Sequence, residues 1–153
     1  MEAFLAGRGH VDPHLFEDVL PTLRELKQRG FRLGSVTNGN ADLCAHAPLL
    51  AGLLDFEVTA GAAGAAKPSA APFLAAAAVA GVSLSQVLHV GDSFADDVVG
   101  ARRVGMKAVH LCRGEGKIRS QAVAAHGALP DAVSSLAELP ALLAHWDEAR
   151  SRL

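Results

Sequence analysis

An α/β fold with a doubly wound parallel sheet is the architecture that the sequence predicts, on two observations. Short apolar runs alternate with helical segments along the whole chain, which is the pattern of parallel strands joined by helices. Polar residues directly follow several of these runs, and the carboxyl ends of parallel strands are where such folds bind ligands. The 153 residues, half of them hydrophobic, are enough for one domain with its own core.

An amphipathic helix is predicted from about Asp18. Val19, Leu23 and Leu26 recur at the spacing of one helix face. Asp18 is placed to cap the start of this helix, and Gly30 is placed to end it. The elements expected next are a strand over residues 31–36, a helix over 41–50 and a strand over 56–59.

A loop rich in alanine and glycine follows and contains one lysine, Lys67. The loop lacks the residue spacing of a P-loop, so it is not expected to bind a nucleotide in that way. Ser69 is placed to cap a helix over residues 70–80, which Gly81 ends. The remaining expected elements are a strand over 86–90, a helix over 95–104, a strand over 107–111, a weaker helix over 118–126, an edge strand over 132–134 and a terminal helix over 136–149.

Composition and charge exclude several classes of protein. The net charge of −2 gives no basic surface for nucleic acid or an anionic membrane. The longest apolar run, residues 70–82, is too short to span a bilayer. The first ten residues lack a basic start followed by an apolar core, so we expect no signal peptide. Cys44 and Cys112 are expected to be reduced thiols of a cytoplasmic protein.

Residues 87–97 are the most informative stretch. An apolar run ends at Gly91, and three carboxylates follow within six residues: Asp92, Asp96 and Asp97. Carboxylates this close repel one another unless a cation or a helix N-terminus compensates them. Mg²⁺ prefers oxygen ligands of this kind. The last two acids, taken alone, would also suit the start of a helix.

Two earlier strand ends carry groups that suit a phosphate. Thr37 and Asn38 provide a hydroxyl and backbone N–H groups at a helix start, and Lys67 provides a point charge that can reach an anion. Taken alone, the first two residues also fit an ordinary turn, and the lysine also fits a surface loop. Together with the acids they predict a site for a phosphate and its metal ion at one edge of the sheet.

Three segments resemble motifs two, three and four of the haloacid dehalogenase superfamily: SVTNGN, KPSAAPF and HVGDSFADDVVGARRVGM. The helix before the first of them, DVLPTLRELKQRG, resembles the phosphatase branch of that family, which carries a small helical cap. The resemblance covers about residues 15–140. It implies a Rossmann-like core that hydrolyses phosphate monoesters of small metabolites with the help of Mg²⁺.

The resemblance implies a role for each site residue. Thr37 would hydrogen-bond the transferring phosphoryl group, with the backbone of Asn38 beside it. Lys67 would be catalytic, because it would offset charge on the phosphoryl group and on the attacking carboxylate. Asp92 would bind Mg²⁺ directly or through water. Asp97, which keeps the register of motif four, would be its second acid, with a catalytic and a metal-binding role.

Motif one of the family is not found. The family's reaction forms an aspartyl-phosphate on an Asp-x-Asp segment that follows an apolar strand, and no such segment precedes Thr37. We expect residues 1–16 to be the end of a cap and residues 17–153 to be a core without its central first strand. The missing strand would leave a gap of roughly 9–10 Å, whose edges either close up or need a partner. The role of Asp96, where the family often has another polar residue, stays open.

Two functions therefore stay open. The first is that of a Mg²⁺-dependent phosphatase. The second is that of an inactive fragment or interaction module, which could self-associate through an exposed sheet edge. Loss of a covalent nucleophile costs roughly 10⁶ in rate, which favours an inactive chain. A receiver-like phosphoacceptor domain is disfavoured, because no acidic cluster follows the first strand.

Overall fold

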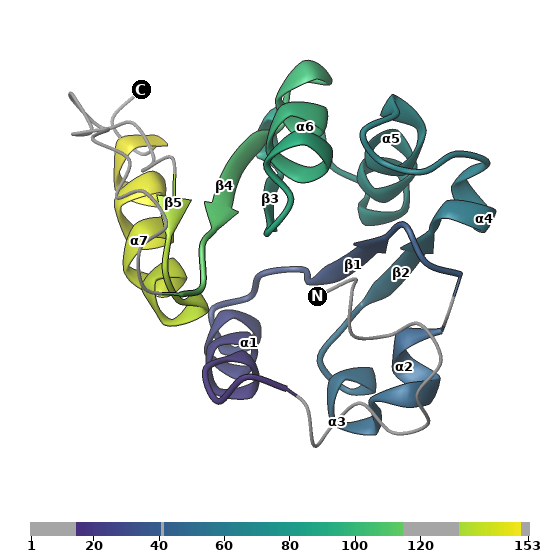
Figure 1. Ribbon diagram of the computed structural model, residues 1–153. Helices are drawn as coiled ribbons and strands as arrows, with labels where there is room; N and C mark the ends of the chain where they lie inside the picture. Colours follow the sequence, from purple (N-terminus) through teal and green to yellow (C-terminus); the bar gives the residue numbers. More distant parts are fainter. Residues whose placement is uncertain (1–14, 41, 115–131, 151–153) are drawn as a thin grey trace.

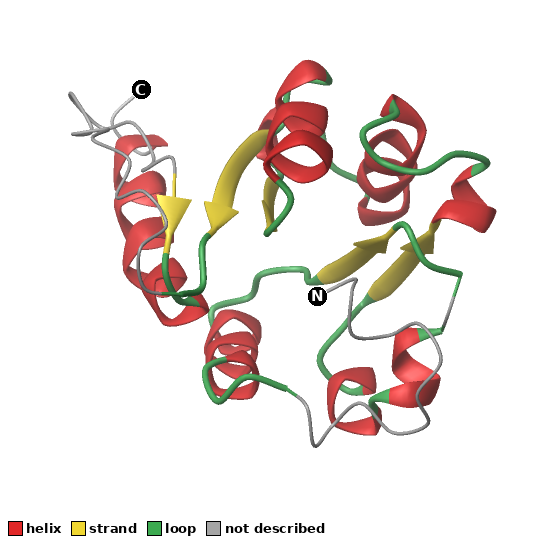
Figure 2. Ribbon diagram, viewed as in Figure 1, coloured by secondary structure: helices red, strands yellow, loops and turns green. Residues whose placement is uncertain are grey.

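The computed structural model describes residues 15–40, 42–114 and 132–150. Within these residues the strands lie between helices on either side (Figures 1 and 2). The strands are β1 (Gly34–Thr37), β2 (Phe56–Thr59), β3 (Leu88–Gly91), β4 (Lys107–Leu111) and β5 (Ala132–Val133). Every pairing between them is parallel, which confirms the predicted class of fold. Residues 1–14 of the expected cap segment and the helix expected over 118–126 lie outside the described residues.

The helices are α1 (Val19–Gln28), α2 (Leu43–His46), α3 (Pro48–Ala51), α4 (Ala60–Ala63), α5 (Ala70–Ala80), α6 (Gly100–Arg103) and α7 (Leu139–Arg150), with the 3₁₀ turns η3 (Leu84–Gln86) and η5 (Leu136–Glu138) and the π-helical segment η4 (Phe94–Val99). The helix expected over 41–50 is divided, because Ala47 has a φ of −133° and Pro48 begins a new helix. The loop expected before Lys67 contains α4, which Thr59 caps. No described helix is long and apolar enough to cross a membrane.

The strands form two separate sheets in the described part of the chain. β1 pairs with β2, and β3, β4 and β5 form a three-stranded sheet. β1 and β3 are the strands that face each other across the division (Figure 1). The division falls where the sequence predicts a missing central strand. Of the two expected outcomes, the edges have not closed up into one sheet.

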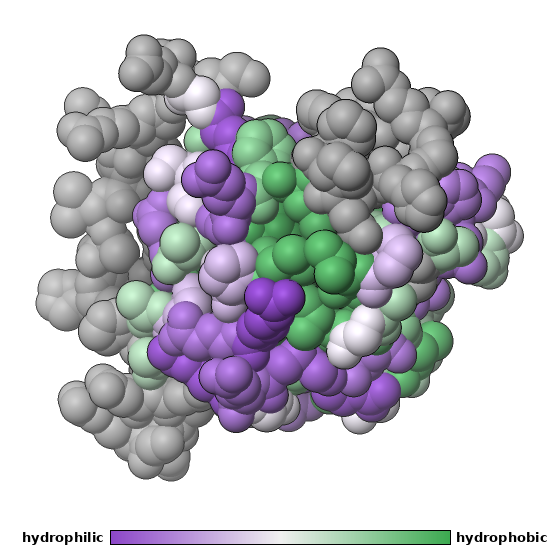
Figure 3. Space-filling view, turned by 90° about the horizontal axis from the view of Figure 1, so that it is seen from below, coloured by the Kyte–Doolittle hydropathy of each residue, from purple (hydrophilic) through white to green (hydrophobic). Residues whose placement is uncertain are grey.

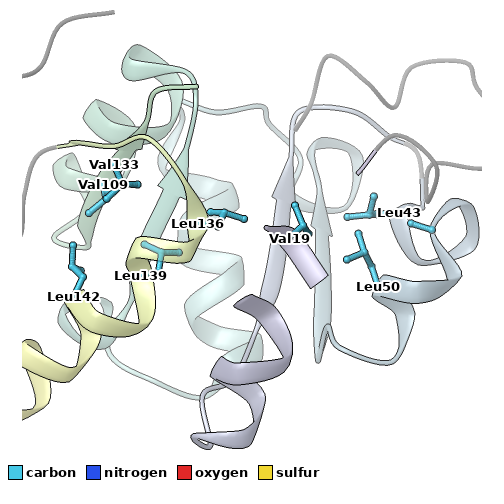
Figure 4. Packing of buried hydrophobic residues seen from close by; sticks show 9 residues of the cluster. Val19, Leu43, Leu50, Val109, Val133, Leu136, Leu139 and Leu142 are labelled. Carbon is cyan, nitrogen blue, oxygen red and sulfur yellow. The ribbon is translucent and has the colours of Figure 1, made fainter. Parts of the chain in front are cut away.

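The largest apolar cluster joins the two halves of the molecule. Val19 of α1 belongs to the same cluster as Leu50 of α3 and Leu139 of α7. Figure 4 shows Leu136 between Val19 and the residues of β4, β5 and α7. Leu88 of β3 is partly buried against this cluster. Helix α1 therefore bridges the two sheets through side-chain packing.

Asp18 anchors α1 to the three-stranded half instead of capping the helix. It stands at the N-cap position, but its side chain makes no cap hydrogen bond, so the predicted cap is wrong. Its Oδ1 accepts a hydrogen bond from Arg113 Nη2 at 2.9 Å, and its Oδ2 accepts from Ser135 Oγ at 2.6 Å and from Leu136 N at 2.7 Å. Burial raises the pKa of Asp18, but these hydrogen bonds lower it by more. The charge-assisted bond to an arginine outweighs a cap bond to a neutral backbone N–H.

A second apolar cluster lies on the other side of the strands, where α5 meets η4 and α6 (Figure 1). Its centre is Phe73 of α5, which is fully buried and packs with Val98 and Ala101. Gly100 permits this packing, because a Cβ at that position would lie 2.9 Å from Phe73 Cε2. This cluster packs α5 against η4, the segment that contains the predicted acids Asp96 and Asp97.

Some large apolar side chains stay exposed in and near the helices α1 and α3. Phe16, just before α1, and Leu49 of α3 are each 50% exposed. Both helices lie at the bottom of Figure 1. The view from below shows apolar side chains gathered at the centre of that face between polar margins (Figure 3).

Candidate active site

The carboxyl end of β1 carries the first of the predicted residues. Thr37 is the last residue of the strand and is buried. Its Oγ1 accepts a hydrogen bond from the Gly39 N–H at 3.0 Å. A hydroxyl can donate its own hydrogen while it accepts such a bond, so Thr37 is equipped to donate to a phosphate oxygen.

Asn38 acts through its side chain. Its Oδ1 accepts from the Lys67 backbone N–H at 2.6 Å, and its Nδ2 donates to the Lys67 carbonyl oxygen at 3.1 Å. These two bonds tie the loop after β1 to the loop that holds the lysine. The sequence predicted only the backbone of Asn38 at the site, since a side chain that pairs with a residue 29 positions away leaves no local pattern.

Lys67 spans the division between the two sheets. Its Nζ donates to the Val36 carbonyl oxygen of β1 and to Asp97 Oδ1, each at 2.7 Å. The Lys67 side chain is only 3% exposed, and a buried ammonium group needs such partners because an unpaired buried charge is costly. The ammonium group therefore connects β1 with the segment that follows β3.

Three donors hold the carboxylate of Asp97, which is 2% exposed. Its Oδ1 accepts from Lys67 Nζ and, at 2.9 Å, from His89 Nε2, and its Oδ2 accepts from the Ser93 N–H at 3.0 Å. Burial raises the pKa of Asp97, but the hydrogen bonds from His89 and Lys67 and the charge of Lys67 lower it by more. The pKa therefore lies well below its usual range, and the carboxylate is ionised at neutral pH. Gly91 makes room for it, since a Cβ there would clash with Asp97 Cγ.

The three acids of the motif occupy different environments. Asp97 is buried, Asp96 is half-buried in the first turn of η4, and Asp92 is exposed. The Asp92 carbonyl oxygen accepts a hydrogen bond from His110 Nε2 at 2.9 Å, and His110 Nδ1 lies 3.0 Å from Cys112 Sγ. The ammonium group of Lys67 compensates the charge of Asp97, and Asp92 is exposed to solvent, so the repulsion that the sequence implies is reduced.

The magnesium site that the sequence predicts depends on Asp92 and Asp97. Asp92 presents an exposed carboxylate at the carboxyl end of β3. Both oxygens of Asp97 accept hydrogen bonds from the protein. Among the residues that the structure describes, no three His, Cys, Asp or Glu side chains lie close enough to hold a metal ion. The metal-binding roles of Asp92 and Asp97 stay predictions.

His89 is a site residue that the sequence analysis missed. It lies on β3 two residues before Gly91, so the two residues share one face of the strand. The Gly91 Cα faces Asp97, and the His89 side chain reaches the same carboxylate. A histidine two positions before the glycine of an acid-rich strand end is the signal that could have identified it.

The parallel strands between helices, with polar residues at the strand ends, define a Rossmann-like core. The chain belongs to the haloacid dehalogenase-like hydrolase family, whose sequence profile matches residues 7–105. This match confirms the resemblance inferred from the three motifs.

Two curated relatives of the chain are phosphatases. The chain is 36% identical over 103 residues to the glyceraldehyde 3-phosphate phosphatase of Methanopyrus kandleri, a match that covers 65% of this chain and 44% of that protein. It is 34% identical over 116 residues to a phosphoserine phosphatase of Thermus thermophilus, covering 74% of this chain and 46% of that protein. The chain thus spans less than half the length of these two relatives.

Solved structures share the fold over most of the chain. A 2-haloacid dehalogenase from Pseudomonas syringae superposes with a TM-score of 0.72 and 38% identity, covering 86% of this chain and 54% of the other. A HAD phosphatase from Thermococcus onnurineus superposes with a TM-score of 0.67 and 28% identity, covering 86% of this chain and 60% of the other. The family thus includes both phosphatases and dehalogenases with this architecture.

Proposed function

We propose that the chain forms the phosphate-binding part of a Mg²⁺-dependent phosphate monoester hydrolase that acts on a small phosphorylated metabolite. The observation that carries this proposal is the buried pair of Lys67 and Asp97, which lies at the carboxyl ends of β1 and β3 close to Thr37. Apolar side chains fill a buried space at least as favourably as an ion pair does. An ion pair at the ligand-binding edge of the sheet therefore points to function more than to folding. The phosphatases among the relatives support the same conclusion.

Each residue then acts on the phosphoryl group in a defined way. Thr37 donates its hydroxyl hydrogen to a phosphoryl oxygen, with Asn38 fixing the loop beside it. Lys67 stabilises negative charge that develops during transfer. Asp97 holds Lys67 in its orientation through the hydrogen bond to its Nζ. Asp92 would hold Mg²⁺, which when bound neutralises part of the phosphoryl charge.

Hydrolysis by this route also needs a nucleophilic carboxylate. The 153 residues contain no Asp-x-Asp segment. We infer that a strand which completes the sheet between β1 and β3 supplies this group. Lys67 supports a place for this strand between β1 and β3, because its Nζ lies 2.7 Å from the Val36 carbonyl oxygen of β1 and also binds Asp97, which follows β3. The ammonium group would thus lie near a carboxylate carried by such a strand.

The proposal is tested by the binding of inorganic phosphate in the presence of Mg²⁺, measured by titration calorimetry. We expect the chain to bind phosphate and Lys67→Met to bind it at least tenfold more weakly, since a charge-assisted hydrogen bond is lost. Hydrolysis of p-nitrophenyl phosphate by the chain alone is expected to stay near the uncatalysed rate. Equal phosphate affinity in the two proteins contradicts the proposal. If the chain alone does hydrolyse p-nitrophenyl phosphate and Asp92→Ala abolishes this activity, the chain has a complete active site.

The divided sheet favours a second candidate, a non-catalytic interaction module. In the part of the chain that the structure describes, β1 and β3 each have an edge with no strand beside it, and such edges pair readily with another chain. In that case the protein would self-associate and would not bind phosphate, so the same titration distinguishes the two candidates.

The Pseudomonas syringae structure favours a third candidate, the removal of halide from a 2-haloacid. The exposed carboxylate of Asp92 argues against it, because it suits a metal ion with a phosphate better than a carboxylate substrate. Chloride release from 2-chloropropionate, measured beside phosphate release, distinguishes the two reactions.

A further inference from the structure

We propose that His89 is a positioning residue of the phosphate site, which fixes the Asp97 carboxylate and, through it, the ammonium group of Lys67. The inference rests on the proposed function, because that function assigns Lys67 and Asp97 to phosphate binding. The interaction itself depends only on geometry within the described residues, so it can be tested separately.

The first step is the hydrogen bond from His89. A carboxylate oxygen only accepts, so the His89 Nε2 at 2.9 Å carries the hydrogen and donates it to Asp97 Oδ1. The same oxygen accepts from Lys67 Nζ at 2.7 Å. One donor comes from strand β3 and the other from a long, flexible side chain. The histidine on the rigid strand therefore sets the direction of this oxygen, together with the Ser93 N–H that holds the other carboxylate oxygen, and the lysine follows.

The second step is that the His89 ring is itself held in place. Its side chain is 12% exposed. The ring of Phe73 meets it edge-on, with centroids 5.2 Å apart and an angle of 88° between the planes. Phe73 is fully buried in the cluster around α5, and Gly100 lies close behind it. A chain of contacts thus runs from the core through Phe73 and His89 to Asp97.

The third step concerns the direction of the lysine N–H groups. An ammonium group has three donors in a tetrahedral arrangement. Two of them point to the Val36 carbonyl oxygen and to Asp97 Oδ1, so the positions of these two oxygens set the orientation of the ammonium group. Rotation of the Asp97 carboxylate would change that orientation. By preventing that rotation, His89 preorganises Lys67 for an anion.

The experiment compares two substitutions with a control. His89→Leu removes the donor at similar volume, whereas His89→Gln keeps an N–H near the position of Nε2. The control is His46→Leu on α2, whose ring bonds to the Asp42 carbonyl oxygen. For each full chain we measure the affinity for inorganic phosphate with Mg²⁺ and the NMR resonances of the Lys67 ammonium group. Thermal unfolding reports general damage.

We expect His89→Leu to bind phosphate about tenfold more weakly and to shift the Lys67 resonances, since one charge-assisted hydrogen bond is lost. His89→Gln should return the affinity to within about threefold of the original, and His46→Leu should change neither reading. Wild-type affinity and unmoved Lys67 resonances in His89→Leu overturn the inference. So does a glutamine variant that is fully folded but as impaired as the leucine variant.

Two further outcomes are also decisive. If the unaltered chain does not bind phosphate, the proposed function fails, and the Lys67 resonances alone decide the role of His89. If His89→Leu does not fold, His89→Asn replaces it, because its shorter amide does not reach Asp97. A difference between the asparagine and glutamine variants then supports the inference, and identical behaviour overturns it.

Discussion

Lys67 and Asp97 carry opposite charges where water is nearly excluded, and each side chain is 3% exposed. Both charges lose their hydration, so the pair adds little stability compared with two apolar side chains of the same size. Removing only one partner has a larger effect, because it leaves the other charge buried and unpaired. The pair therefore makes the fold sensitive to substitution at the same residues that the phosphate site requires.

Lys67→Met is expected to lower the free energy of unfolding by about 3 kcal/mol, the usual cost of an unpaired buried charge. The matched control is Lys27→Met. Lys27 also lies 2.7 Å from an aspartate, Asp55, but these two side chains are 31% and 26% exposed. For this exposed pair we expect a loss below about 1 kcal/mol. Urea unfolding measures both values, and equal losses would contradict the argument from burial.

The low pKa of Asp97 predicts a pH dependence of stability. The pKa in the folded chain lies below the ordinary value of 3.8, so the ionised carboxylate stabilises the fold. This contribution is present above the ordinary value and is lost as the pH falls from there toward the pKa of the folded state. From pH 7 to pH 3, the free energy of unfolding of Asp97→Asn should therefore fall by about 1 kcal/mol less than that of the unaltered chain. Urea unfolding at both pH values checks this, and identical losses would count against it.

The elements that the sequence predicted well carry their own local signals. Helix α5 has a serine at its start and a glycine with a φ of 67° at its end, and it forms over the predicted residues. β2 and β4 also match their predicted ranges. The predictions failed where distant residues decide the outcome. Asp18 suits a cap by type, but Arg113 and Ser135 offer it other partners, and no local pattern indicates an arginine 95 residues away.

Substitution of Asp18 distinguishes an anchor from a cap. Serine is a good N-cap residue, so Asp18→Ser would be nearly neutral if capping were the role. Because the side chain instead binds Arg113, Ser135 and Leu136, we expect Asp18→Ser to lower the free energy of unfolding by about 2 kcal/mol, as much as Asp18→Ala. Thermal and urea unfolding of the two variants provide the measurement, with the exposed neighbour Glu17→Ala as control. A serine variant as stable as the original would restore the cap interpretation.

The division of the sheet could be predicted because a missing motif is visible in the sequence itself. Thr37, Lys67 and Asp97 could be assigned to one edge of the sheet because each follows a strand that the sequence predicts. The sequence did not predict that α1 would bridge the two sheets, nor that Asn38 would bind the lysine loop by its side chain. Both depend on packing between parts of the chain that are far apart in sequence.

Within residues 15–40, 42–114 and 132–150, no strand pairs with the facing edges of β1 and β3, and such edges predict self-association of the chain. Size exclusion with light scattering over a range of concentrations should show a dimer or a larger species. Leu49→Glu, which places a charge on the exposed apolar side of α3, should leave this association unchanged if the strand edges carry the contact. A monomer at every concentration would contradict the prediction. Loss of association in Leu49→Glu would instead assign the contact between chains to the exposed apolar side of α3.

The contact between Asp18 and the Leu136 N–H joins residues 118 positions apart, and it has a consequence for hydrogen exchange. The amide hydrogen of Leu136 can exchange with solvent when the Asp18 carboxylate releases it. The exchange rate of this single amide therefore reports how often the contact between Asp18 and η5 opens.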